Sequence, residues 1–132
     1  MIDRQTAIEH FQGIGVHLSI RQDSPAVFGI QCRNRSITDD SLFYLQAFRE
    51  ELTVIGLERT QVSDNGLRQL MDMPKLDNVD LTNTSITDAG LEFLSKIKTL
   101  EYLHVEGTRV TANGISQVRS ALPNCEVAWD GD

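Results

Sequence analysis

The feature that most constrains the fold is a repeat of 24 to 25 residues. Four related segments begin with Ile or Val, continue with Thr or Ser, and end in aliphatic residues three apart. They are ITDDSLFYL (37–45), VSDNGLRQL (62–70), ITDAGLEFL (86–94) and VTANGISQV (110–118). A second segment precedes each of them: VFGIQC (27–32), LTVIGL (52–57), LDNVDL (76–81) and LEYLHV (100–105). A fixed period of this size is typical of repeat architectures, in which neighbouring units share one core.

Each repeat divides into two elements with different periods. In LDNVDL, Val79 and Leu81 alternate with polar residues, which predicts a short strand with one buried face. In TDAGLEFLSKI, Leu91, Leu94 and Ile97 recur at intervals of three, which predicts one apolar face of a short helix. Neither element can bury its apolar side alone. Stacked repeats are therefore expected to form a parallel sheet covered by a row of helices.

The consensus LxxLxLxxT followed by [IV]-[TS]-D-x-G-L resembles the leucine-rich repeats. The period of 24 residues with a helix resembles their ribonuclease-inhibitor-like subclass, and T-x-[IV]-T-D-x-G-L is especially similar to short bacterial leucine-rich-repeat proteins. The match spans residues 27 to about 129. One departure is that Thr60, Thr84 and Thr108 stand where many members carry Asn, and Arg35 holds that place in the first repeat. The resemblance implies an α/β fold, a right-handed leucine-rich-repeat solenoid of about four repeats.

Both ends of the chain are expected to cap this array, because an open end would expose core and unpaired strand groups. We predict a helix over 3–12, an antiparallel hairpin of 15–20 with 27–32, and a last strand in CEVAW (125–129) on which Trp129 covers the core. Either Phe43 or Tyr44 should pack under the first cap, whereas His10 and His17 have no evident partners. The whole chain, 1–132, is predicted to be one domain, with a cap (1–26), repeats (27–124) and a C-terminal strand and tail (125–132).

The charge balance excludes some classes of partner. The net charge is −7 with a pI of about 4.8, which argues against nucleic acid and anionic membranes, since both require clustered Lys and Arg. The apolar runs are shorter than the roughly 18 residues of a membrane helix. Because no secretory pattern opens the sequence, we expect a cytoplasmic protein. Cys32 and Cys125 lie four strand steps apart, on the order of 19 Å, too far for a disulfide.

A column of aspartates is the first candidate for chemistry. Asp39, Asp64 and Asp88 share one repeat position, so they could bind Ca²⁺ or act as acid and base. Each also follows Thr or Ser at the start of a helix, where the hydroxyl would cap free N–H groups and the carboxylate would face the helix dipole. Glycines suited to a tight turn follow at 66, 90 and 114. Ala112 replaces Asp in the fourth copy, which favours the structural interpretation.

The series Thr60, Thr84 and Thr108 has two interpretations as well. The hydroxyls can bond neighbouring backbone in the bend after each strand, or they can form a strip that binds a ligand. We favour the bonds to the backbone.

The outward side chains of the strands are the second candidate. Alignment of the repeats predicts three columns on the concave sheet face: Gly29, Val54, Asn78 and Tyr102; Gln31, Gly56, Asp80 and His104; Arg33, Glu58, Thr82 and Glu106. The leading hypothesis is a non-catalytic protein–protein interaction module that binds a protein partner there and needs no cofactor or metal. Its predicted contact residues are Tyr102, His104, Asp80, Glu58, Glu106, Asn78 and Arg33.

Three alternatives remain. His104 beside Asp80 could make a small metal-dependent or hydrolytic enzyme. The chain could instead be a structural or oligomerising unit that pairs through a terminal edge, so that it is a monomer or a weak homo-oligomer. The concave face could also be merely solvated.

Overall fold

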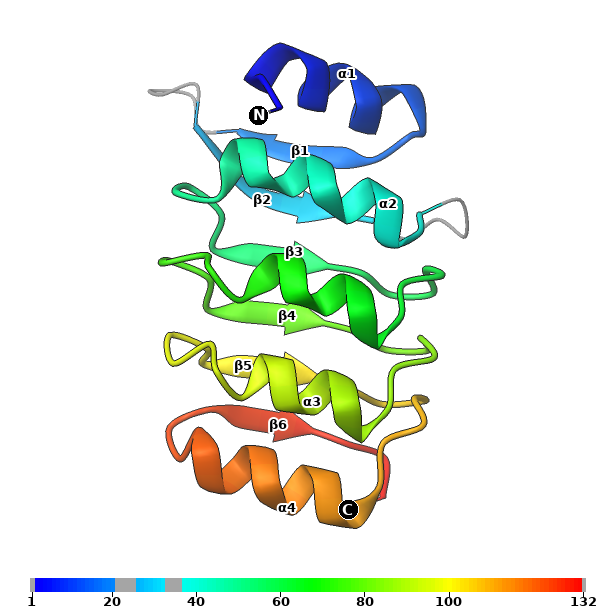
Figure 1. Cartoon of the computed structure of the whole chain (residues 1–132), viewed down its shortest axis with the longest axis vertical. Helices are drawn as coiled ribbons and strands as arrows, with labels where there is room; N and C mark the ends of the chain where they lie inside the picture. Colours follow the sequence, from blue (N-terminus) through cyan, green and yellow to red (C-terminus); the bar gives the residue numbers. More distant parts are fainter. Residues whose placement is uncertain (1, 21–25, 33–36, 132) are drawn as a thin grey trace.

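The fold is mixed α/β, with one six-stranded sheet and a row of helices (Figure 1). It is a computed structural model that describes residues 2–20, 26–32 and 37–131. The strands are β1 (His17–Ile20), β2 (Val27–Gln31), β3 (Val54–Gly56), β4 (Asn78–Asp80), β5 (Tyr102–His104) and β6 (Glu126–Ala128). The helical segments are α1 (Arg4–Gly13), α2 (Asp39–Leu42), η1 (Phe43–Phe48), η2 (Asp64–Leu70), α3 (Asp88–Leu94) and α4 (Ala112–Ala121). The segments η1 and η2 are 3₁₀ helices.

The strands lie in the sheet in the order in which they occur along the chain. β1 pairs antiparallel with β2, and every later pair is parallel. The predicted hairpin and the predicted alignment of the repeats are both confirmed. The inward residues Ile30, Ile55, Val79, Leu103 and Val127 occupy one row.

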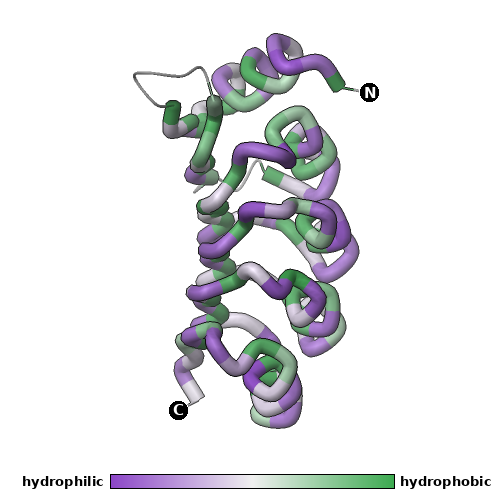
Figure 2. The backbone as a smooth tube through the Cα atoms, turned by 90° about the vertical axis from the view of Figure 1, so that its left-hand side faces the viewer, coloured by the Kyte–Doolittle hydropathy of each residue, from purple (hydrophilic) through white to green (hydrophobic). Residues whose placement is uncertain are grey.

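All helical segments lie on one side of the sheet, as the side view in Figure 2 shows. The apolar residues between the two layers form one core cluster that extends from Ala7 to Val127. The opposite side of the sheet carries no described helix, and we call it the open face. Its residues alternate with the buried ones along each strand, as Asn78 and Asp80 do around the fully buried Val79.

Three residues past the ends of β3, β4 and β5, one residue of each loop has a positive φ, in the left-handed region. Arg59, Asn83 and Gly107 have φ values of 60°, 59° and 70°. The N–H of Arg59 donates to the Thr82 carbonyl at 3.0 Å, and that of Asn83 donates to the Glu106 carbonyl at 2.8 Å. At the end of the series, the N–H of Gly107 donates to the Asp130 carboxylate at 3.0 Å. Asp130 is the residue equivalent to Thr82 and Glu106, and its side chain takes the place of the backbone carbonyl that those two residues offer.

The N-terminal helix is anchored by charge and by ring stacking. Glu51 accepts from the Arg4 guanidinium at 2.6 Å and from the Val27 N–H at 2.7 Å, so one carboxylate joins α1 to the start of β2. The His10 ring stacks on Tyr44 with centroids 3.8 Å apart. The expectation that His10 has no partner is therefore wrong, and burial lowers its pKa.

Of the two aromatic residues on the first repeat helix, Tyr44 is the one that packs under the cap. Its ring contacts His10 and Phe11, whereas Phe43 is 49% exposed. This confirms the prediction that one of the pair serves the cap.

The C-terminal strand contributes its apolar side chains to the core. Val127 is buried, and Trp129 packs half-buried against the core cluster, as expected. Both cysteines are free; burial raises the pKa of Cys32 to about 12 and also raises that of Cys125. No helix in the described part of the chain is long and apolar enough to cross a membrane.

Candidate functional site

Four of the predicted contact residues lie on neighbouring strands of the open face: Asn78, Asp80, Tyr102 and His104. Tyr102 has Asn78 and Glu126 as its partners on the two neighbouring strands. In the adjacent row, His104 has Asp80 and Ala128 as its partners. The strand pairing over β2 to β5 therefore matches two of the predicted columns, the one from Gly29 to Tyr102 and the one from Gln31 to His104.

The polar contacts on this face differ from the pairing that the sequence suggests. His104 Nδ1 lies 3.9 Å from Glu106 Oε1, and the two side chains are 39% and 49% exposed. Asp80 Oδ1 instead accepts from the Thr82 N–H at 2.9 Å and from the Thr82 hydroxyl at 2.6 Å. Asp80 and His104 are neighbours on adjacent strands. The described polar contact of each side chain is instead with a residue two positions later in its own segment, Thr82 for Asp80 and Glu106 for His104.

The remaining predicted residues lie at different places. Asn78 and Glu58 are half-buried, at the start of β4 and just past the end of β3. Arg33 lies outside the described residues. The structure adds Glu126, which is exposed beside Tyr102 and was not predicted. The signal for Glu126 was its position 24 residues after Tyr102, the same step that relates Tyr102 to Asn78.

The part of the open face over β2 and β3 has less charge. The Gln31 side chain covers Gly56 so closely that a Cβ atom there would collide with its amide. Gly29 and Val54 fill the adjacent row. Among the six described strands, the acidic residues of the open face therefore belong to β4 and β6, as Asp80 and Glu126.

The aspartate column joins successive strand–helix units. Asp39 accepts from the Ser63 N–H and hydroxyl, and Asp64 accepts from the Thr87 N–H at 2.7 Å and its hydroxyl at 2.6 Å. Asp88 binds Thr111 in the same way, at 2.8 and 2.6 Å. We expected these carboxylates to face their own helix termini, but they bind the next unit. Ala112 stands at the equivalent position of the fourth unit.

The hydroxyls of this series act as helix caps in two of four units. Thr87 accepts from the Ala89 N–H and Thr111 accepts from the Gly114 N–H, both at 3.3 Å. Thr38 and Ser63 make no side-chain cap bond. The predicted capping role is confirmed for Thr87 and is wrong for Thr38 and Ser63.

The glycines of the motif have a different role from the one predicted. Gly66, Gly90 and Gly114 lie within the first helical turn and do not have positive φ. A Cβ atom on Gly90 would lie 2.5 Å from Asp64 Oδ1, and the other two glycines meet Asp39 and Asp88 in the same way. Glycine is required because the carboxylate of the preceding unit occupies the space of a side chain.

The threonine series is confirmed as part of the bends. Thr60, Thr84 and Thr108 donate to the carbonyls of Leu57, Leu81 and Val105 at 2.7 to 2.8 Å. Thr60 and Thr84 are buried, at 6% and 5% exposure, so these hydroxyls are not offered to a ligand.

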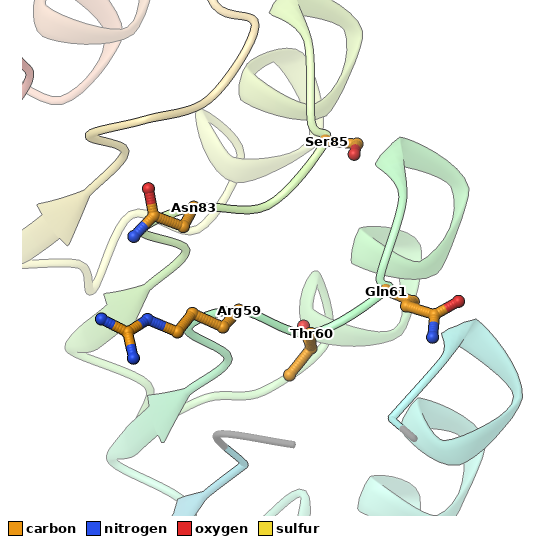
Figure 3. Close-up of a pocket in the computed structure, with 5 residues that line it drawn as sticks. All are labelled: Arg59, Thr60, Gln61, Asn83 and Ser85. Carbon is orange, nitrogen blue, oxygen red and sulfur yellow. The ribbon is translucent and has the colours of Figure 1, made fainter. Parts of the chain in front are cut away.

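A polar depression of about 650 Å³ lies over the loops that follow β3 and β4. Its lining residues are Arg59, Thr60, Gln61, Asn83 and Ser85. Figure 3 shows that the Arg59 and Asn83 side chains extend to one side of the stacked loops, while Gln61 and Ser85 lie at the other end of these loops. A ligand site requires side chains that converge on one point, and these five side chains do not.

The described segments contain no cluster of side chains that could hold a metal ion. Among residues 2–20, 26–32 and 37–131, no three His, Cys, Asp or Glu side chains gather as ligands of one ion.

Comparisons with known proteins show similar folds at low sequence identity. No protein-family model and no curated protein matches this chain. The structure of the Mex67:Mtr2 subunits of Chaetomium has a TM-score of 0.59 at 18% identity, covering 74% of this chain and 72% of that one. The actin-binding site 2 of leiomodin-1 has a TM-score of 0.63 at 13% identity, covering 98% and 80%. A leucine-rich-repeat protein of Leptospira interrogans has a TM-score of 0.47 at 15% identity, covering 65% and 27%.

Proposed function

We propose that this chain is a non-catalytic protein–protein interaction module that binds a protein partner through the open face. The observation that carries the proposal is Tyr102, a residue 46% exposed on β5, between Asn78 and Glu126. Exposed tyrosines supply large contact areas and are enriched among the residues that dominate interface energies. A free sheet face with such a residue is suited to a macromolecular partner.

The proposal includes the finer description of the fold, a right-handed leucine-rich-repeat solenoid of about four repeats whose open face is concave. The 24-residue register of β3 to β6 supports it, as do the aspartate bonds between successive units. Solenoids of this kind offer extended binding surfaces. Two proteins of similar fold are the Mex67:Mtr2 subunits of Chaetomium and the actin-binding site 2 of leiomodin-1. They support the proposal by analogy, since a fold by itself does not define a function.

Cross-linking tests the proposal directly. A photoreactive amino acid at position 102 should cross-link to a protein in cells of the source organism, and Tyr102→Ala/His104→Ala should lose that protein in affinity capture. The matched control is the same amino acid at position 116, because Ser116 is exposed on α4 on the helical side. Cross-links from position 116 but not from 102 would contradict the proposal.

A metal-dependent or hydrolytic activity is the second candidate, because His104 lies 3.9 Å from Glu106 and beside Asp80. These side chains are well exposed, so the site does not exclude water as most catalytic sites do. Calorimetric titration with Zn²⁺, Mn²⁺ and Ca²⁺ tests the metal-dependent form. A heat of binding that His104→Ala abolishes would support it, whereas silence with all three ions would rule it out.

A further inference from the structure

We propose that the partner segment on the open face is basic, rich in Lys or Arg, and that it binds over β4 to β6. This inference rests on the proposed function and specifies the chemistry of its partner. We call the surface formed by Asp80, Tyr102, His104, Glu106 and Glu126 the β4–β6 patch. Its charge, its free acceptors and its exposed ring each point to a cationic ligand.

The charge of this surface is one-sided. The six described strands contain no Lys or Arg, whereas Asp80 and Glu126 belong to β4 and β6 and Glu106 follows β5. At the end of β3, Arg59 follows Glu58, so that corner is closer to neutral. Within the β4–β6 patch, the residue that can carry a positive charge is His104, which lies beside Glu106. A partner of complementary charge is therefore positive.

The carboxylates retain acceptor capacity for such a partner. The described hydrogen bonds to the Asp80 side chain reach Oδ1, which leaves Oδ2 as an acceptor. Glu106 is 49% exposed and has only a long contact, of 3.9 Å, with His104. Glu126 is exposed and forms no ion pair with the described residues. By contrast, Asp39, Asp64 and Asp88 already accept two hydrogen bonds each from the next unit.

The Tyr102 ring adds a second kind of attraction for a cation. It is 46% exposed and lies next to Glu126 across the strands. An aromatic face attracts Lys and Arg through its quadrupole, and the apolar stem of either side chain can cover the ring while its charged head meets a carboxylate. An acidic segment would gain neither contact and would be repelled by three carboxylates.

The test uses NMR on the isotope-labelled full chain with three synthetic peptides of equal length, alternating Lys and Ser, Gln and Ser, or Glu and Ser. The Lys peptide should shift the amide signals of β4 to β6 more than those of the helices. Its binding should weaken as salt rises from about 50 to about 200 mM, because screening reduces exposed charge interactions. The Gln and Glu peptides should leave these signals unchanged.

Charge-matched variants separate a specific patch from general acidity. Glu106→Gln/Glu126→Gln should weaken binding of the Lys peptide roughly three- to ten-fold, as expected for two exposed ion pairs. The control Asp40→Asn/Glu92→Gln removes the same charge from exposed helical positions and should change binding by less than about two-fold. Equal weakening by both pairs would overturn the inference, and so would the absence of β4–β6 shifts with the Lys peptide.

The two proposals can fail separately. If the Gln or Glu peptide binds the open face, or if the protein cross-linked from position 102 contacts it through an acidic segment, the basic-partner inference is wrong and the interaction module stands. If position 102 cross-links to no protein while position 116 does, the interaction surface itself is wrong.

Discussion

The Asp88 carboxylate occupies the space into which a side chain on Gly114 would extend. The same carboxylate accepts hydrogen bonds from the N–H and hydroxyl of Thr111. Asp, Thr and Gly thus form one contact across the boundary between two units. The equivalent contacts of Asp39 with Gly66 and of Asp64 with Gly90 make this boundary a repeated feature.

Replacing Gly114 with Ala should destabilise the protein, although the same change usually stabilises a helix by up to about 1 kcal/mol. The added Cβ atom would collide with Asp88, and such overpacking costs about 1–3 kcal/mol. Urea denaturation followed by circular dichroism measures the effect.

The control for this prediction is the same change in an Asp88→Ala background. Asp88→Ala alone should cost about 0.5–1.5 kcal/mol, since the N–H and hydroxyl of Thr111 exchange this acceptor for water. Once the carboxylate is gone, Gly114→Ala should become neutral or stabilising. Additive effects of the two substitutions would contradict a direct contact.

Arg59→Asn should stabilise the protein by about 0.5–1 kcal/mol. Arg59 has a φ of 60°, a left-handed conformation that costs a long side chain more than Asn or Gly, and the equivalent positions carry Asn83 and Gly107. The N–H of residue 59 still donates to the Thr82 carbonyl, so the bend is kept. A rise in the midpoint of urea unfolding checks the prediction, and Asn83→Arg should lower it; a fall with Arg59→Asn would refute the argument.

The N-terminal cap should weaken in acid through His10. Burial lowers the pKa of His10 in the folded state, so the unfolded chain binds the proton more tightly. The stabilisation is present above about pH 6.5, the ordinary value, and is lost as the pH falls from there toward the folded pKa. Thermal unfolding at about pH 7.5 and about pH 5 should show a smaller fall in Tm for His10→Phe than for the natural sequence.

His10→Phe is suitable because it keeps a ring against Tyr44 and removes the titrating group. His17→Gln is the control at an exposed position of β1. An unchanged pH dependence in His10→Phe would show that His10 does not weaken the cap.

Arg119→Ala should increase self-association through the last strand. Glu126 and Ala128 form backbone hydrogen bonds with the residues on either side of β5, so the Val127 carbonyl points to the outer edge of β6. There the Arg119 guanidinium donates to it at 3.0 Å. Free edges of a sheet invite pairing with another chain. Light scattering at high concentration should report a larger mass for Arg119→Ala than for the control Ser120→Ala, and equal masses would contradict an edge-blocking role.

Periodicity predicted the parts of the fold that depend on alternation of apolar and polar residues. The strand alignment, the hairpin that contains Leu18 and Ile30, and the outward position of Tyr102 all follow from burying one face of each element. Glu126 was missed because the predicted column ended at Tyr102 and was not continued onto the last strand, β6. The position of Asp80 beside His104 is confirmed, but its hydrogen-bond donor was not predicted. Register places whole residues, whereas the nearest donor to a short side chain is decided locally, here by Thr82.

The sequence by itself determined the α/β class, the unit length and the residues that face outward, because periods of two and of about 3.6 residues leave few ways to bury the apolar ones. Only the tertiary structure decided what the motif residues do. Asp88 and Gly114 are 26 residues apart in the chain, so no local sequence pattern indicates that the carboxylate of one fills the space beside the other. Their contact exists because stacking brings the first turn of one helix against the first turn of the next, and hydrogen-bond geometry then selects which donor each carboxylate binds.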